Sequence, residues 1–114
     1  MNDARVTKSL GVALLAVVVL SAAQAKQTFT GIVTDSECEK ADHARMRMGD
    51  TDAECVKACV DAHGAAYVLY DGQNVYALSD QRTAATFAAR RVRVVGTLKA
   101  GTKSIDVESM SAAR

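Results

Sequence analysis

Short stretches of alternating or β-branched apolar residues recur along the chain after residue 25 and predict a small β framework. The clearest is RVRVVGTL at 91–98, where Val92 and Val94 alternate with Arg91 and Arg93. This alternation places the two valines in the core and the two arginines in solvent. Four further strands are predicted at 28–35, at 66–71, at 74–78 and around Ile105 and Val107.

A helix is predicted between the first two of these strands. Thr51 and Glu54 have the spacing of a capping box, and Gly64 suits the left-handed position that follows a helix. At 100° per residue, Cys55 and Cys59 lie on the apolar stripe of this helix, together with His63. We therefore expect the cysteines to face the core.

Two other segments have weaker helical signals. A short helix begins after Ser79, with Phe87 as its expected main core residue. Ser36 to Glu39 has the S-x-x-E spacing of a cap, but the segment that follows has a poor apolar pattern. A short helix and a loop both remain possible there.

The order of these elements predicts the fold class. A strand, a helical insert at about 36–64, two strands, a helix and two strands make a mainly β protein with a helical insert. Five strands with a helix between the third and the fourth form the OB-fold, a small Greek-key barrel. We therefore expect a five-stranded OB-like barrel, and an α+β sandwich is the alternative.

The first 25 residues have the pattern of an export signal. Arg5 and Lys8 precede an apolar run over 10–20, and Ala23-Gln24-Ala25 forms a small-x-small cleavage site. The run is too short to cross a hydrocarbon core of about 30 Å as a helix, so no membrane span is expected after cleavage. The prediction is a periplasmic or secreted protein whose residues 26–114 form a single domain.

The charge balance excludes some classes of partner. The chain has 14 basic and 13 acidic residues, and without the signal the two kinds are equal in number. Nucleic acids and anionic membranes attract surfaces with an excess of Lys and Arg. No nucleic-acid partner is therefore expected, and a small ligand or an envelope protein is the expected partner.

Candidate ligand residues are concentrated between Cys38 and His63. This stretch contains all three cysteines, both histidines and two of the four methionines of the chain. Cys38, His43, Cys55 and Cys59 offer three thiolates and an imidazole, a sufficient tetrahedral set for zinc. Adding the thioethers of Met46 and Met48 gives a set that suits copper(I). The spacing is not one of the common zinc-finger spacings.

A disulfide is the other interpretation of the cysteines. In an oxidising compartment, the cysteines of a small domain are usually paired, and three cysteines allow one bond. Cys55 and Cys59 lie one helical turn apart, which is poor geometry for a bond between them. We predict a Cys38–Cys59 disulfide, which would stabilise the fold by about 3 kcal/mol. Cys55, close to the positive end of the helix, stays free or binds metal.

Several catalytic interpretations fail on spacing. Covalent haem attachment needs C-x-x-C-H and a thioredoxin-like site needs C-x-x-C, whereas this chain has C-x-x-x-C. A Cys–His nucleophile needs a third, orienting residue, and none is identifiable. The residues indicate a binding module rather than an enzyme, and the alternative is a thiol- or redox-active protein that uses Cys55 or Cys59.

The motifs GIVTDSEC, CVKACV, YVLYDG, VYALSD, VRVVGTL and IDVESM resemble a family of small exported bacterial proteins. The family is described as a domain of unknown function with an OB-like barrel. The resemblance extends from Thr28 to Met110, and its most specific part is the set Cys38, His43, Cys55 and Cys59. The family often has glycine after the first cysteine, where this chain has Glu39. The resemblance implies export and a barrel, and it implies no activity.

Overall fold

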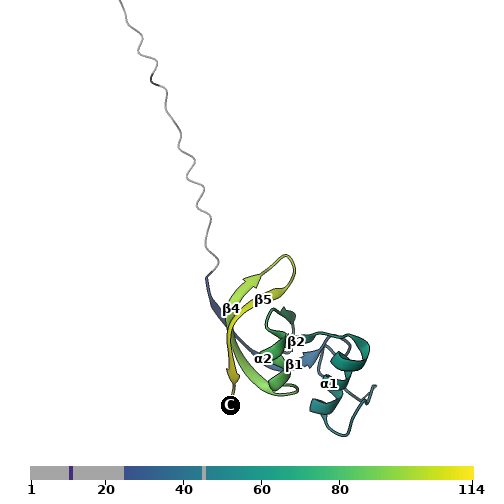
Figure 1. Ribbon diagram of the computed structural model, residues 1–114. Coiled ribbons are helices and arrows are strands. Elements are labelled where there is room, and N and C mark those ends of the chain that lie inside the picture. Colours follow the sequence, from purple (N-terminus) through teal and green to yellow (C-terminus); the bar gives the residue numbers. More distant parts are fainter. Residues whose placement is uncertain (1–10, 12–24, 45) are drawn as a thin grey trace, which may run out of the picture.

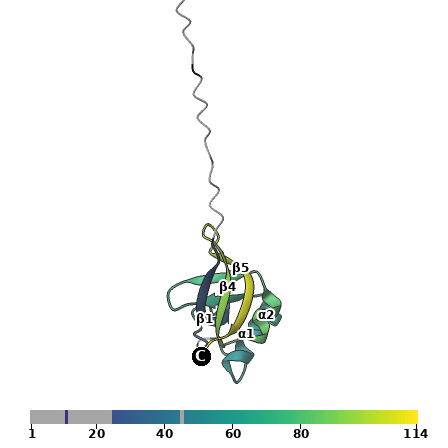
Figure 2. The same ribbon diagram turned by 90° about the vertical axis from the view of Figure 1, so that its left-hand side faces the viewer.

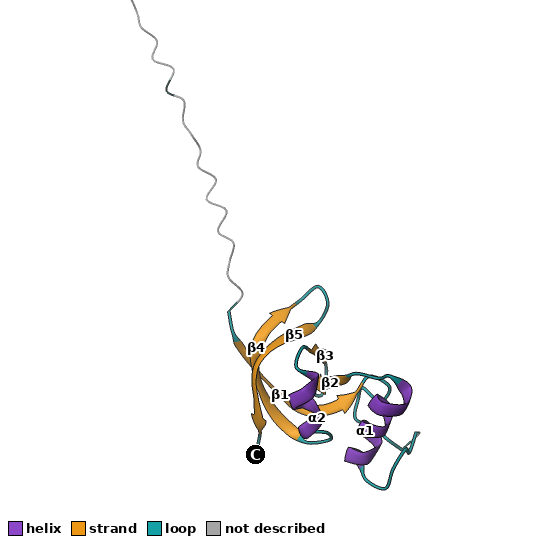
Figure 3. Ribbon diagram, in the orientation of Figure 1, coloured by secondary structure: helices purple, strands orange, loops and turns teal. Residues whose placement is uncertain are grey.

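The computed structural model describes Gly11, residues 25–44 and residues 46–114. The predicted export signal lies outside the described residues, apart from Gly11 and Ala25. The described chain forms a β-barrel with two short helices (Figures 1 and 3). The elements in chain order are β1 (Gln27–Asp35), α1 (Asp52–His63), β2 (Tyr67–Tyr70), β3 (Val75–Leu78), α2 (Gln81–Thr86), β4 (Arg91–Lys99) and β5 (Ser104–Ala112).

The five strands close into a barrel in the order β1-β2-β3-β5-β4. Figure 2 shows β1, β4 and β5 side by side in this barrel. Neighbouring strands are antiparallel except β3 and β5, which are parallel. With α2 between β3 and β4, this is the strand arrangement of an OB-like Greek-key barrel. The predicted fold class is confirmed, and the sandwich alternative is wrong because the sheet closes on itself.

The core confirms the alternation that the sequence shows in β4. Val92 and Val94 are fully buried, whereas Arg91 and Arg93 are exposed. Val33, Leu69 and Ile105 contribute further side chains with no exposed surface, and Val56 of α1 joins the same core cluster. Helix α1 is therefore packed onto the barrel through its apolar face, at the end where β1 finishes (Figure 1).

Strand β1 pairs with two neighbouring strands, and Gly31 lies beside the residue at which the partner changes. Residues Gln27 to Ile32 pair with β4, and residues Ile32 to Asp35 pair with β2. A Cβ atom at Gly31 would lie 2.4 Å from the carbonyl oxygen of Tyr70, so no other residue fits there without a shift of the backbone. A glycine here lets β1 pass close to Tyr70 beside the point where its pairing changes from β4 to β2.

Helix α1 begins and ends as predicted. The Thr51 side chain accepts from the Glu54 amide, and the Glu54 carboxylate accepts from the Thr51 amide. Gly64 follows with a φ of 65°, in the left-handed region. Cys55, Val56 and Cys59 are the buried residues of the helix, as expected, but His63 is exposed in its last turn. The inward stripe therefore ends at Cys59.

Helix α2 differs from the prediction in its core residue. Asp80 caps it by accepting from the amide of Thr83. Ala84 and Ala88 are the buried side chains here, whereas Phe87 is only partly buried and has the Arg90 guanidinium 5.3 Å from its ring centroid. Small residues suffice because α2 lies close against the barrel. Neither described helix has the length and apolar run that a bilayer-spanning helix needs.

Candidate metal site at the end of strand β1

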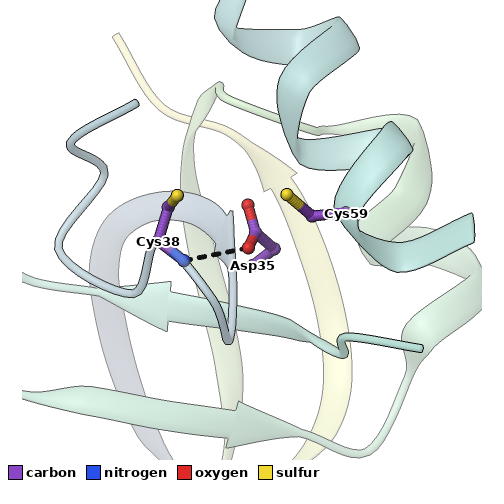
Figure 4. A group of neighbouring side chains, drawn as sticks. All are labelled: Asp35, Cys38 and Cys59. Carbon is purple, nitrogen blue, oxygen red and sulfur yellow. Dashed lines mark hydrogen bonds between the residues drawn. The ribbon is translucent and has the colours of Figure 1, made fainter. Parts of the chain in front are cut away.

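Three buried side chains converge where β1 ends. Asp35 is the last residue of β1, Cys38 lies in the loop that follows, and Cys59 projects from α1 (Figure 4). One carboxylate oxygen and the two sulfur atoms all lie within 4.8 Å of one another. Asp35 and Cys59 have no exposed surface, and Cys38 is 9% exposed. Residues 24 positions apart in the chain thus meet in one small polar cluster within an apolar core.

Backbone amides hold the Asp35 carboxylate in place. Its Oδ1 accepts from the amides of Glu37 and Cys38, each at 2.9 Å. This is the local turn that aspartate forms with the amides two and three residues later. The other oxygen, Oδ2, is buried and has no hydrogen-bond partner. In Figure 4 the carboxylate lies between the two sulfur atoms.

The loop that carries Cys38 is fixed from both sides. The backbone carbonyl of Cys38 accepts from the Thr34 hydroxyl at 2.7 Å and from the Ala41 amide at 2.9 Å. The Ser36 side chain accepts from the amide of Ala66, next to the start of β2. Ser36 therefore ties the loop to the barrel instead of capping a helix, and residues 36–50 form a loop in their described part.

Burial and the neighbouring carboxylate keep both sulfurs protonated in the metal-free protein. Burial, followed by the charge of Asp35, raises the pKa of Cys59 to about 11. The same two causes in the same order raise the pKa of Cys38. A cation that binds here must displace protons from the two thiols, because the thiolate is the metal ligand.

Of the four residues predicted as metal ligands, the structure brings Cys38 and Cys59 together and adds Asp35. Cys55 is buried nearby, and its Sγ donates to the carbonyl of Gly49 at 3.4 Å. His43 is buried as well, and its Nδ1 has no hydrogen-bond partner. Neither residue belongs to the group whose ligand atoms lie within 4.8 Å of one another.

The remaining predictions concern the two methionines and the disulfide. Met46 and Met48 are 40% and 37% exposed, whereas Asp35, Cys38 and Cys59 are buried. All three cysteines are present as thiols. The Cys38–Cys59 disulfide stays a prediction, and its two sulfur atoms are neighbours in the cluster.

The sequence pattern predicts Asp35 only as the end of a strand, whereas the structure places it in this cluster. The sequence does contain a signal for Asp35. An aspartate can accept a hydrogen bond from the backbone amide three residues later, which places Asp35 beside Cys38. The described part of the chain has no pocket. The three ligand atoms lie within 4.8 Å of one another, close enough to bind one ion, and these donors suit a thiophilic cation.

Comparisons of the chain with protein-family models, with curated proteins and with solved structures found no match. No relative therefore supplies an activity for this barrel. A function has to be inferred from the fold, the cluster of Asp35, Cys38 and Cys59, and the chemistry of its donors.

Proposed function

We propose that this protein is an exported binding module that holds a thiophilic metal ion, zinc, at Asp35, Cys38 and Cys59. The observation that carries the proposal is the buried Oδ2 of Asp35, which has no hydrogen-bond partner beside two buried thiols. A buried polar atom without a partner costs about 1–3 kcal/mol. A bound cation supplies that partner, and the side chains of Asp35, Cys38 and Cys59 become its ligands.

The charges favour zinc over copper(I). When ionised, the three side chains carry three negative charges, of which Zn²⁺ neutralises two and Cu⁺ only one. Charge that stays uncompensated in a buried site is costly, so the divalent ion suits this cluster better. Zinc also accepts carboxylate and thiolate ligands together. Copper(I) prefers sulfur, and Met46 and Met48 are exposed, whereas the donors of the cluster are buried.

The thiol- or redox-active alternative has less support. Cys55 and Cys59 have no exposed surface, and the pKa of Cys59 is raised to about 11. Reactive cysteines are accessible and have a lowered pKa, because the thiolate is the nucleophile. Burial behind the barrel surface suits a bound ion or a structural bond better than exchange with another molecule.

Export is the second part of the proposal, and its support is the composition of residues 1–25. Strand β1 begins at Gln27, so cleavage after Ala25 would leave every strand of the barrel complete. Expression of the full chain followed by N-terminal sequencing tests this part. A mature protein that begins at Lys26 in the periplasm or the medium supports it, and an uncleaved chain in the cytoplasm contradicts it.

Metal analysis of the protein purified under reducing, anaerobic conditions tests the binding function. We expect one zinc per chain, and we expect uptake of the ion to protect two thiols from alkylation. Cys38→Ala and Cys59→Ala should each abolish stoichiometric binding while circular dichroism still shows the barrel. Cys55→Ala is the matched control, since it removes a buried thiol outside the cluster. A folded wild-type protein that binds no zinc would overturn the proposal.

A further inference from the structure

We infer that His43 supplies a fourth ligand to this ion through Nδ1, which closes the site around the metal. The inference rests on the proposed function and adds a consequence to it. A site with four protein ligands retains or transfers its ion, whereas a catalytic zinc keeps one position open for water or substrate.

The exposure of the loop singles out His43. Between Glu39 and Met48, it is the only buried side chain among the described residues, at 4% exposure. Its Nδ1 is inaccessible to solvent and has no hydrogen-bond partner. Buried polar nitrogen atoms normally have a partner, so this one indicates a group that the protein alone does not provide. A metal ion that already has Asp35, Cys38 and Cys59 as ligands is such a group.

The other candidate for the fourth position is Cys55, and two observations count against it. Its sulfur already has a partner, the carbonyl of Gly49 at 3.4 Å. As a ligand it would also have to ionise and add a fourth negative charge to a buried site, whereas a neutral imidazole adds none. His43 therefore completes the set at a lower electrostatic cost.

The loop that carries His43 can deliver it to the ion. His43 lies outside the group of atoms within 4.8 Å, so binding requires residues 39–44 to move inwards. The hydrogen bonds of this segment are local ones, from the Ala41 amide to the Cys38 carbonyl and from the Ala44 amide to the Asp42 carboxylate. Ala41 has a φ of 58°, a left-handed conformation that alanine rarely adopts. Among the described residues, the hydrogen bonds of this segment reach no further than Cys38, so the segment can shift while the barrel keeps its shape.

Cobalt(II) and zinc are the probes that test this inference, and His63 provides the control. His63 is the only other histidine of the chain, and it is exposed at the end of α1. The full set of variants is wild type, His43→Ala and His63→Ala. For each, the measurements are zinc affinity by competition with a chromophoric chelator and the visible spectrum of the cobalt(II) form.

The expected result is specific to His43. Wild type and His63→Ala should show the intense visible bands of tetrahedral cobalt(II), with charge-transfer intensity for two thiolates. His43→Ala should bind zinc at least about tenfold more weakly, and its cobalt spectrum should shift as water enters the vacated position. Long-range proton–nitrogen NMR of the zinc form should show the metal on Nδ1 of His43.

Three results would overturn the inference while leaving the proposed function intact. They are equal zinc affinity and equal cobalt spectra for His43→Ala and His63→Ala, charge-transfer intensity for three thiolates, or a metal shift on neither nitrogen of His43. Failure of the proposed function has a different signature, because it would appear as no zinc binding by the wild type itself. Circular dichroism of the metal-free His43→Ala protein separates loss of a ligand from loss of folding.

Discussion

The backbone amide of Cys38 donates to Oδ1 of Asp35 at 2.9 Å, so the residue that ends β1 also fixes the first cysteine of the site. One carboxylate thus has two separate tasks. Its Oδ1 organises the turn, and its Oδ2 faces the cluster without a hydrogen-bond partner. These tasks can be separated by mutation, because asparagine keeps the first oxygen and replaces the second.

Asp35→Asn should fold as the wild type does and bind zinc at least about tenfold more weakly, because the turn keeps its acceptor and the metal loses a charged ligand. Asp35→Ala should also destabilise the metal-free protein, by about 1–3 kcal/mol, since the amides of Glu37 and Cys38 lose their acceptor. Urea unfolding and chelator competition measure the two effects. Unchanged zinc affinity in Asp35→Asn would remove Asp35 from the site.

The stability of the metal-free protein should depend on Cys59 at alkaline pH. Its pKa is raised in the folded state from an ordinary 9.0 to about 11. Between these values the unfolded chain loses the proton that the folded protein keeps, so folding becomes less favourable as pH rises. The stabilising effect is complete below pH 9 and is lost as pH rises through about 11. Urea unfolding with a chelator present measures the free energy of unfolding, which should fall less steeply with rising pH in Cys59→Ala than in the wild type. Equal slopes would contradict the raised pKa of Cys59.

Oxidation of the metal-free protein should join Cys38 to Cys59 and leave Cys55 as a free thiol. The sulfur atoms of Cys38 and Cys59 lie within 4.8 Å of each other, whereas the Cys55 thiol donates a hydrogen bond to the Gly49 carbonyl. Peptide mapping under non-reducing conditions identifies the bond. A Cys38–Cys55 bond would contradict the pairing. Zinc and the disulfide require the same two sulfurs, so zinc added before the oxidant should prevent the bond.

Thr51→Ala should destabilise the protein by about 1 kcal/mol, because α1 loses the side chain that accepts the Glu54 amide. Thermal or urea unfolding measures the change. Thr28→Ala provides a control, since Thr28 is an exposed threonine of β1 and the structure shows no side-chain hydrogen bond for it. If the two variants unfold alike, the capping box contributes nothing measurable.

Val94→Asp should prevent folding, whereas Arg93→Asp should be tolerated. Val94 has no exposed surface and Arg93 is exposed, so only the first change places a charge in the core. Circular dichroism and expression in soluble form distinguish the two outcomes. Similar behaviour of the two variants would mean that the register of β4 in solution differs from the one described.

The framework of this protein was predictable because its signals are local. Strict alternation in β4, a capping box at Thr51 and a left-handed Gly64 each determine their structure within a few residues. The expectation for Phe87 was wrong for a reason that is not local. How deeply α2 approaches the barrel depends on the other strands, and that close approach favours Ala84 and Ala88 as the buried residues.

The site was only partly predictable because it depends on tertiary contacts. The residue types predicted Cys38, His43, Cys55 and Cys59 as ligands, and the structure brings Cys38 and Cys59 together. The sequence could not show which of the nearby groups meet them. Asp35 enters because β1 ends beneath α1, and His63 is excluded because the inward stripe ends one turn earlier. Both facts follow from how the helix is seated on the barrel.

The parallel pairing of β3 with β5 is a short seam in the barrel, and it determines where local opening of the barrel begins. Strands β3 and β5 share two register pairs, Ala77 with Ser104 and Leu78 with Ile105, whereas β4 and β5 share eight. Local opening begins where the fewest bonds must break. In the cyclic strand order this seam lies away from β1, so hydrogen exchange should start at the Ala77 and Ser79 amides. The barrel can therefore open on one side while the corner that contains Asp35, Cys38 and Cys59 keeps its shape.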